Sequence, residues 1–289
     1  LHSFPTRRSS DLILGFEDPG IGVVPNDAPT LSKDAKQLLL QKAASCRWDL
    51  INFDISTAFL KGEGDGRPLG IHPPGEIRKA LHMKEGDQCG LEGGAYGRVD
   101  APFLWYRAFK ATLESLGFLT CPMDGCLFSL VTPDAKGKPK VRGVLGIRVD
   151  DGIGAGDEYF KGVIAKLRSI YDFGAYNERE FDFCGVHYKQ WDDGTIEMDQ
   201  MGYLQKIEPI EISRNRRGQP EENVTEVERQ QLRRLCGSLQ YGAVHTRPDL
   251  AAKTGQLQAI VTRAKVRHLI EANRVLYEGK DRKSTRLNS

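Results

Sequence analysis

The sequence lacks several features that would assign it to a simple class. It contains no apolar run near the ~20 residues that a membrane-spanning helix needs, so we predict no membrane contact. Its six cysteines form no C-x-x-C pair, which argues against a zinc site or a disulfide scaffold and favours reduced thiols in an intracellular protein. The net charge is only +2 over 289 residues, so overall basicity gives no support for nucleic-acid binding.

The two ends of the chain also lack apolar periodicity. Residues 1–12 and 281–289 read as translated sequencing-adapter sequence, so we exclude both from fold reasoning and expect a fragment of a longer protein. Without them the net charge is about −1. Residues 201–280 hold fourteen Lys or Arg against nine Asp or Glu; we interpret this as a solvated helical surface, with a phosphate-facing surface as the alternative.

Hydrophobic periodicity predicts a mixed chain. The expected helices are 32–46, capped by Ser32 with Leu38, Leu39 and Lys42 at helical spacing, 101–116 and 157–171. The expected strands are 48–53, 126–131 and 141–149, followed by a hairpin over 181–199. Residues 61–94 should form loops with short strands, and a mainly helical region should follow a polar linker at 213–222. The pattern favours an α+β fold with helices on one face of an antiparallel sheet.

Three aspartates at strand ends are the candidate chemical groups. Asp150 and Asp151 end an apolar run at an Asp-Gly turn signal, and Asp54 ends a separate predicted strand. Carboxylates placed in this way could hold two divalent cations for in-line phosphoryl or nucleotidyl transfer. An Asp-Asp pair alone is a weak indicator, because the chain has a second pair, Asp192-Asp193, that we interpret as an ordinary hairpin turn.

The segment Gly152–Asp157 allows another interpretation. It follows a predicted strand and opens a predicted helix, as a dinucleotide-binding turn does. The third glycine of that motif would have to be residue 157, which is Asp. A carboxylate there would repel a pyrophosphate, so we disfavour this alternative.

An ordered set of motifs is more specific than either aspartate pair. Asp54–Gly62, Ala95–Tyr106 and Arg148–Asp151 resemble, in order, characteristic blocks of the reverse transcriptases of Ty1/copia-type retrotransposons. Shorter matches occur in the same order at Ile71–Gly75, Leu116–Phe118, Asp124–Phe128, Phe183–Gly185, Gly237–Tyr241 and Thr246–Asp249. Within the last of these blocks and just before it, we expect a structural role for His245, Arg247 and Asp249.

The resemblance implies a polymerase right hand. Residues 13–212 would form partial fingers and the palm, and residues 213–280 a thumb- or connection-like helical region. The implied activity is RNA-directed DNA polymerisation within a polyprotein that also carries integrase and ribonuclease H. The implied partners are an RNA template, a DNA primer or RNA–DNA hybrid, and dNTPs. The implied compartment is the cytoplasm, in a virus-like particle, or the nucleus.

The resemblance also implies roles for single residues. Asp54 and Asp150 match aspartates that ligate catalytic magnesium, with Asp151 as a supporting third carboxylate for two Mg²⁺ ions that Mn²⁺ can replace. Ile55, by a backbone contact, would complete the metal site. The incoming nucleotide would be bound by Phe59, Tyr96 and Gly97. Phe59 matches the aromatic residue that excludes a ribose 2′-hydroxyl, and a buried core aromatic is the open alternative.

Three departures from the family pattern affect these expectations. Arg148 replaces a tyrosine beside the primer end, where Arg can bind phosphate. Arg98-Val99-Asp100 replaces Leu-Lys-Gln, which would put neutral and acidic residues where the family has a basic position near the template. The fingers strand that grips the triphosphate would precede Ile13, so we expect impaired polymerisation by this fragment. The alternative function is a non-catalytic relic or an adopted nucleic-acid-binding domain, which would not need three clustered aspartates.

Overall fold

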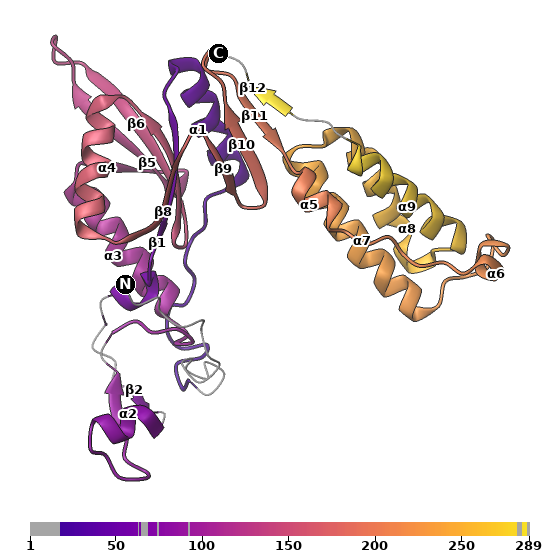
Figure 1. The fold of residues 1–289 in the computed structure, drawn as a ribbon, viewed down its shortest axis with the longest axis horizontal. Helices are drawn as coiled ribbons and strands as arrows, with labels where there is room; N and C mark the ends of the chain where they lie inside the picture. Colours follow the sequence, from indigo (N-terminus) through magenta and orange to yellow (C-terminus); the bar gives the residue numbers. More distant parts are fainter. Residues whose placement is uncertain are drawn as a thin grey trace. The chain divides into compact units, whose positions relative to one another are not determined.

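The computed structural model describes residues 18–62, 64, 69–73, 75–91 and 93–281, with the backbone of 285–287. The chain is an α+β protein whose contacts divide it into two units, one containing Ile51–Tyr176 and the other containing Leu40–Leu50 and Asn177–Ser289 (Figure 1). The predicted adapter segment 1–12 lies outside the described residues. The assignment of 13–212 and 213–280 to separate domains stays a prediction.

A six-stranded sheet in the order β4-β5-β6-β7-β1-β8 forms the first unit. Its strands are β1 (Leu50–Ile55), β4 (Phe118–Cys121), β5 (Asp124–Pro133), β6 (Pro139–Arg148), β7 (Asp151–Gly156) and β8 (Phe173–Glu178). The β4–β5, β5–β6 and β6–β7 pairs are antiparallel, and β5 and β6 contain the predicted strands 126–131 and 141–149 except for Val149. Because β1 is the neighbour of β7, the end of β1 meets the turn between β6 and β7.

Two helices share one hydrophobic core with this sheet. Trp105, Phe109 and Leu113 of α3 (Ala101–Ser115) recur every four residues and are buried. Phe160 and Leu167 of α4 (Glu158–Ile170) enter the same cluster. Each such side chain contributes about 1.5–3 kcal/mol when it leaves water, so the apolar stripes hold both helices on the sheet. These two helices confirm the predictions for 101–116 and 157–171.

The first helix, α1 (Lys33–Cys46), has the predicted cap but a different buried side. The Ser32 hydroxyl accepts a hydrogen bond from the Ala35 backbone N–H at 3.1 Å. Leu39 is buried, whereas Leu38 is 63% exposed and Lys42 is exposed, so of the three helically spaced residues only Leu39 faces the core. Adjacent helical residues point about 100° apart, and the buried stripe continues instead through small residues at helical spacing. The stripe consists of Ala35, Leu39, Leu40, Ala43 and Ala44.

Strand β7 was not predicted, because half of its six residues are glycine, which has low strand propensity. The glycines alternate and therefore share one face. A Cβ added to Gly152 would lie 2.3 Å from the Phe53 ring, and one added to Gly156 would lie 2.3 Å from the Phe160 ring. The missing side chains thus let the two rings pack against the sheet. Because this segment pairs with β6, it does not form the disfavoured dinucleotide-binding turn.

Smaller elements complete the first unit. Strands β2 (Leu69–Ile71) and β3 (Cys89–Leu91) pair antiparallel and flank α2 (Gly75–Ala80). They agree with the short strands predicted within 61–94. The helix was not predicted, and it has no buried residue, so the sequence offers no apolar stripe to reveal it.

The second unit contains a further sheet in the order β12-β11-β10-β9. The strands are β9 (Glu180–Phe183), β10 (Val186–Gln190), β11 (Ile196–Asp199) and β12 (Thr285–Leu287). The predicted turn at Asp192-Asp193 is confirmed: Gly194 has φ 88°, the Asp192 side chain is 98% exposed, and Asp193 accepts the Thr195 N–H at 2.8 Å.

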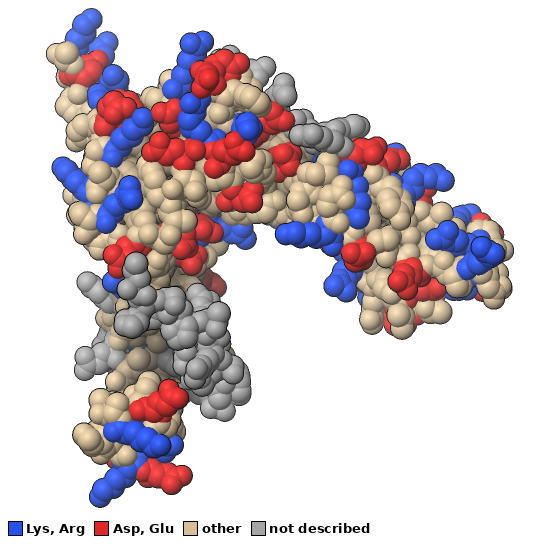
Figure 2. Space-filling model, viewed as in Figure 1, with Lys and Arg blue, Asp and Glu red and all other residues tan. Residues whose placement is uncertain are grey.

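The rest of the second unit is helical, as predicted. Its helices are α5 (Met201–Gln205), α6 (Arg214–Arg217), α7 (Glu226–His245), α8 (Ala251–Ile260) and α9 (Val266–Lys280). Basic and acidic side chains intermingle over this region in Figure 2, and ion pairs such as Arg229–Glu226 and Arg267–Glu221 join them at 2.6 Å. This supports a solvated mixed surface.

Among the described residues no helix is long and apolar enough to cross a membrane, and all six cysteines are free.

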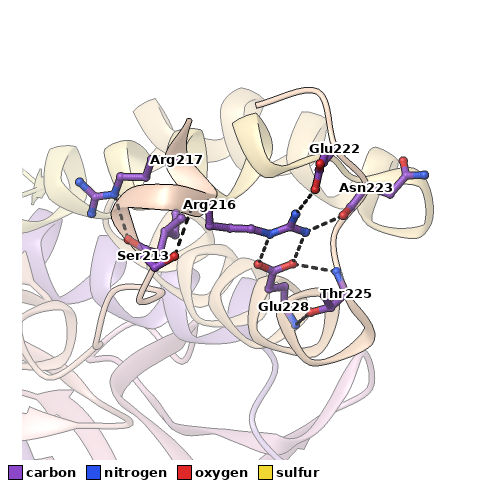
Figure 3. A network of polar contacts seen from close by, with 8 residues as sticks. Ser213, Arg216, Arg217, Glu222, Asn223, Thr225 and Glu228 are labelled. Atoms are coloured by element: carbon purple, nitrogen blue, oxygen red, sulfur yellow. Dashed lines mark hydrogen bonds and ion pairs between the residues drawn. The ribbon is translucent and has the colours of Figure 1, made fainter. Parts of the chain in front are cut away.

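Arg216, in the predicted polar linker at 213–222, forms hydrogen bonds to the start of α7 (Figure 3). Its guanidinium donates two hydrogen bonds of 2.9 Å to Glu228 and one of 2.6 Å to Glu222. Glu228 also accepts the Thr225 backbone N–H at 2.7 Å, which closes a capping box. The bonds from Arg216 lower the pKa of Glu228 to about 2.

Carbonyl groups at the C-terminal end of α9 accept hydrogen bonds from a buried arginine. Arg247 is 1% exposed and donates to the carbonyl oxygens of Glu278 at 2.9 Å and Gly279 at 2.6 Å. Asp249 pairs with the same guanidinium at 2.8 Å. The carbonyls at a helix end have no partner within the helix, so this contact confirms the expected structural role of Arg247 and Asp249. The ring of His245 packs at 4.6 Å from that of Tyr241.

Candidate active site

The ends of two strands bring the three predicted aspartates into one region. Asp54 precedes Ile55, whose backbone N–H donates to the carbonyl of Asp150 at 3.0 Å. Arg148 and Asp151 are the last pair of the β6–β7 ladder, so Asp150 lies in the turn between them. The negative charges of Asp150 and Asp54 both act on Asp151. A turn does occur next to the Asp-Gly dipeptide, but its two residues are Val149 and Asp150, whereas Asp151 and Gly152 already belong to β7.

The electrostatics of this region disfavour three ionised carboxylates. Burial, followed by repulsion from Asp150 and then Asp54, raises the pKa of Asp151 from 3.8 to about 6, and Arg148 opposes the shift. At neutral pH Asp151 is thus ionised at a cost that a cation would offset.

The three carboxylates suit magnesium in their chemistry but not in their spacing. Carboxylate oxygens are the ligands that hard divalent ions prefer, so the chemistry of the donor set is suitable. Within the described ranges, however, no three His, Cys, Asp or Glu side chains are close enough together to hold one metal ion. The assignment of Asp54, Asp150 and Asp151 as metal ligands stays a prediction.

A cavity of about 260 Å³ lies directly over the turn. Its lining contains Phe59, Tyr96, Arg148, Val149, Asp150 and Asp151. The cavity therefore brings Asp150 and Asp151 together with Phe59 and Tyr96, two of the residues that were predicted to bind nucleotide. This volume is slightly below the ~300–1,000 Å³ range of small-molecule sites.

The aromatic wall of this cavity comes from a short helix and a loop. Phe59, in the short helix η3 (Ala58–Lys61), packs edge-on against Tyr96 with 5.4 Å between ring centroids. Phe59 is half-buried and also touches the hydrophobic core, so both interpretations of this residue stay open. Gly97 has φ 90°, a conformation that favours glycine. The side chain of Ile55 is 1% exposed, so only its backbone could face a ligand.

A glycine that the sequence analysis missed makes room for Asp54. A Cβ added to Gly174 of β8 would lie 2.7 Å from Asp54 Oδ2 and 2.8 Å from Ser56 Oγ. A glycine inside a strand often marks such a close approach, so the glycine at position 174 is the sequence feature that could have indicated this contact.

Asp100, the acidic residue of the Arg98-Val99-Asp100 replacement, is buried and paired, and its distance from a template stays a prediction. Its carboxylate forms a bidentate ion pair with Arg98, at 2.6 Å from Nε and 3.0 Å from Nη2, and both side chains are at most 2% exposed. The two-residue spacing lets the guanidinium fork match the carboxylate. The two charges neutralise each other inside the protein, so this replacement adds no acidic surface.

Comparisons with known proteins agree with these features. A family model described as reverse transcriptase (RNA-dependent DNA polymerase) matches residues 13–216. The chain is 24% identical over 271 residues to a retrovirus-related Pol polyprotein from transposon RE1 of Arabidopsis thaliana, covering 89% of the chain and 18% of the polyprotein. It is 24% identical over 267 residues to the corresponding polyprotein from transposon TNT 1-94 of Nicotiana tabacum, covering 84% and 19%. A transposon Ty5-1 protein of Saccharomyces cerevisiae is 25% identical over 241 residues, covering 77% and 73%. The chain thus spans about a fifth of the two plant polyproteins.

Proposed function

Because the chain belongs to the reverse transcriptase (RNA-dependent DNA polymerase) family, and to its Ty1/copia type, we propose that it carries the nucleotidyl-transfer site of a retrotransposon Pol polyprotein. The observation that supports this most directly is the position of Asp150 and Asp151 on the cavity lined by Phe59 and Tyr96, with Asp54 within electrostatic range. The six-stranded sheet would be the palm with partial fingers, and the helices after residue 212 a thumb- or connection-like region. The partners would be an RNA template, a DNA primer and dNTPs.

The residues of the site would divide the reaction between them. Asp54 and Asp150 would hold two magnesium or manganese ions, supported by Asp151. When bound, these ions would lower the pKa of the primer 3′-hydroxyl and stabilise the negative charge of the leaving pyrophosphate. Phe59 would lie beneath the incoming sugar and exclude a 2′-hydroxyl.

The basic and backbone groups would orient the substrates. Arg148 is exposed beside the turn, where its guanidinium would bind a phosphate of the primer end. Tyr96 and Gly97 would line the nucleotide pocket, and the backbone of Ile55 would contact the second metal ion. In the parent polyprotein, integrase and ribonuclease H would be the neighbouring modules.

Primer extension on an RNA template tests this proposal, with this chain and with a longer segment of its parent polyprotein. Asp150→Asn should lower the rate by about 100-fold or more, because a neutral amide stabilises transition-state charge poorly. Asp192→Asn is the matched control, since it makes the same change in an exposed turn. Extension at the original rate in Asp150→Asn would refute the assignment. Extension by neither length, with or without metal, would favour the non-catalytic alternative.

A further inference from the structure

The turn that carries Asp150 has a strained backbone. Val149 has φ 60°, in the left-handed region that glycine adopts freely and that a β-branched residue adopts at a cost. Turns of two residues between paired strands commonly require such a conformation, which is why glycine and asparagine dominate them. Valine does not supply it by its own preference, so other contacts must hold this turn in place.

Two contacts from different elements hold the turn. The indole N–H of Trp105 on α3 donates to the carbonyl oxygen of Val149 at 2.6 Å. The backbone N–H of Ile55 on β1 donates to the next carbonyl oxygen, that of Asp150, at 3.0 Å. Both carbonyls of the turn are therefore fixed, one by a helix and one by a neighbouring strand.

Trp105 is itself rigid. It is 1% exposed, its ring stacks on Phe109 at 4.9 Å, and the ring of Tyr171 meets it edge-on at 5.4 Å. A side chain held on both sides cannot change rotamer without disturbing the core. Its single donor group is thus presented to the turn at a fixed place.

We propose that Trp105 is a positioning residue that holds the strained Val149-Asp150 turn through its indole N–H, and so fixes the carboxylate of Asp150 over the cavity. The role of that carboxylate rests on the proposed function, whereas the restraint of the turn by the Trp105 hydrogen bond does not. Loss of the hydrogen bond would let the turn relax toward an allowed conformation of Val149, which would rotate the backbone that carries Asp150.

Two variants separate this role from simple core packing. Trp105→Phe keeps an aromatic ring in the core but removes the N–H. Val149→Gly removes the conformational strain, so in the double variant the turn no longer needs the lost hydrogen bond. A residue that only fills the core would not be rescued by a glycine in the turn. Trp191→Phe is the matched control, because it removes an indole N–H bond to Glu197 in the second unit.

Hydrogen exchange of the metal-free protein gives the deciding measurement. Trp105→Phe should speed exchange in the peptide that spans Arg148–Asp151 by about tenfold, the effect of losing one hydrogen bond of ordinary strength. Adding Val149→Gly should return the rate to within about threefold of the wild type, and Trp191→Phe should leave it unchanged. Unchanged exchange in Trp105→Phe, or an equal effect of Trp105→Phe with glycine at 149, would overturn the proposal.

Magnesium binding separates this proposal from the proposed function. If both hold, Trp105→Phe should raise the Mg²⁺ concentration that half-saturates thermal stabilisation by about tenfold, and Val149→Gly should reverse the change. A wild type that Mg²⁺ does not stabilise would count against the proposed function alone, because the exchange comparison uses no metal. Faster exchange with unchanged Mg²⁺ half-saturation would overturn the link from the turn to the carboxylate of Asp150.

Discussion

Replacing Asp151 by Asn should stabilise the metal-free protein while impairing its proposed function. The side chain is held in a partly buried cluster with Asp150 and Asp54, and its pKa is raised to about 6. A raised pKa means that the folded protein binds the proton more tightly than the unfolded chain does. The ionised form therefore costs folding free energy, and Asn removes that cost without changing the size of the side chain.

The size and the pH range of the effect follow from the pKa shift. The difference between 3.8 and about 6 is about two units, and each unit is worth about 1.4 kcal/mol, so about 3 kcal/mol is the upper limit. Partial exposure screens the charges, so we expect a gain of about 1–2 kcal/mol. Below pH ~4 the carboxyl is protonated in both states and the gain vanishes; it grows as the pH rises to about 6 and is complete above that.

Thermal unfolding in a chelating buffer measures the gain. At pH 7.5 the unfolding midpoint of Asp151→Asn should exceed that of the wild type by about 3–6 °C, and near pH 4 the midpoints should agree. Saturating Mg²⁺ should reduce the difference at pH 7.5, because the wild type binds the cation better and gains more from it. Asp192→Asn, which changes an exposed turn, should shift neither midpoint.

An Asp151→Asn variant that is no more stable than the wild type at pH 7.5 would contradict this prediction. An equal gain at both pH values would also contradict it, because repulsion between ionised carboxylates must disappear when they are protonated. A gain that Mg²⁺ leaves unchanged would mean that the cluster is repulsive but does not bind the cation.

Local sequence patterns predicted the elements whose structure depends on near neighbours. The four-residue spacing of Trp105, Phe109 and Leu113 specifies α3 because those side chains cover one side of any helix. The hairpin at Asp192-Asp193-Gly194 depends on turn chemistry that the residues carry themselves. Asp54 and Asp150 were recognised in the same way, as polar residues that end apolar runs.

Features that depend on distant residues were missed. Gly152 and Gly156 weaken a strand by local preference, and their value appears only when Phe53 and Phe160 are placed against them. The short distance between Gly174 and Asp54 has the same origin, since the two residues belong to neighbouring strands far apart in sequence. No local rule could place these contacts, because each is created by the packing of the whole sheet.

Gly174→Ala should fold normally but lower primer extension by about 10-fold or more, because the added methyl group would lie 2.7 Å from Asp54 Oδ2 and displace that carboxylate. Gly162→Ala is the control, since Gly162 has open space around it. Equal activity of the two variants would contradict this prediction. Glu228→Gln should destabilise the second unit by about 1–2 kcal/mol at pH 7 in urea unfolding. That loss should disappear as the pH falls from about 4.5 to about 2, where Glu228 itself is protonated, and Glu271→Gln in an exposed ion pair should cost almost nothing. Phe59→Ala tests the two interpretations of the cavity wall. If the ring lies beneath the incoming sugar, the variant should incorporate ribonucleotides more readily at nearly unchanged stability, because only a steric clash is removed. If the ring is a core residue, the variant should lose up to ~3–5 kcal/mol of stability and keep its sugar selectivity, so measuring both quantities on the same preparation decides between them.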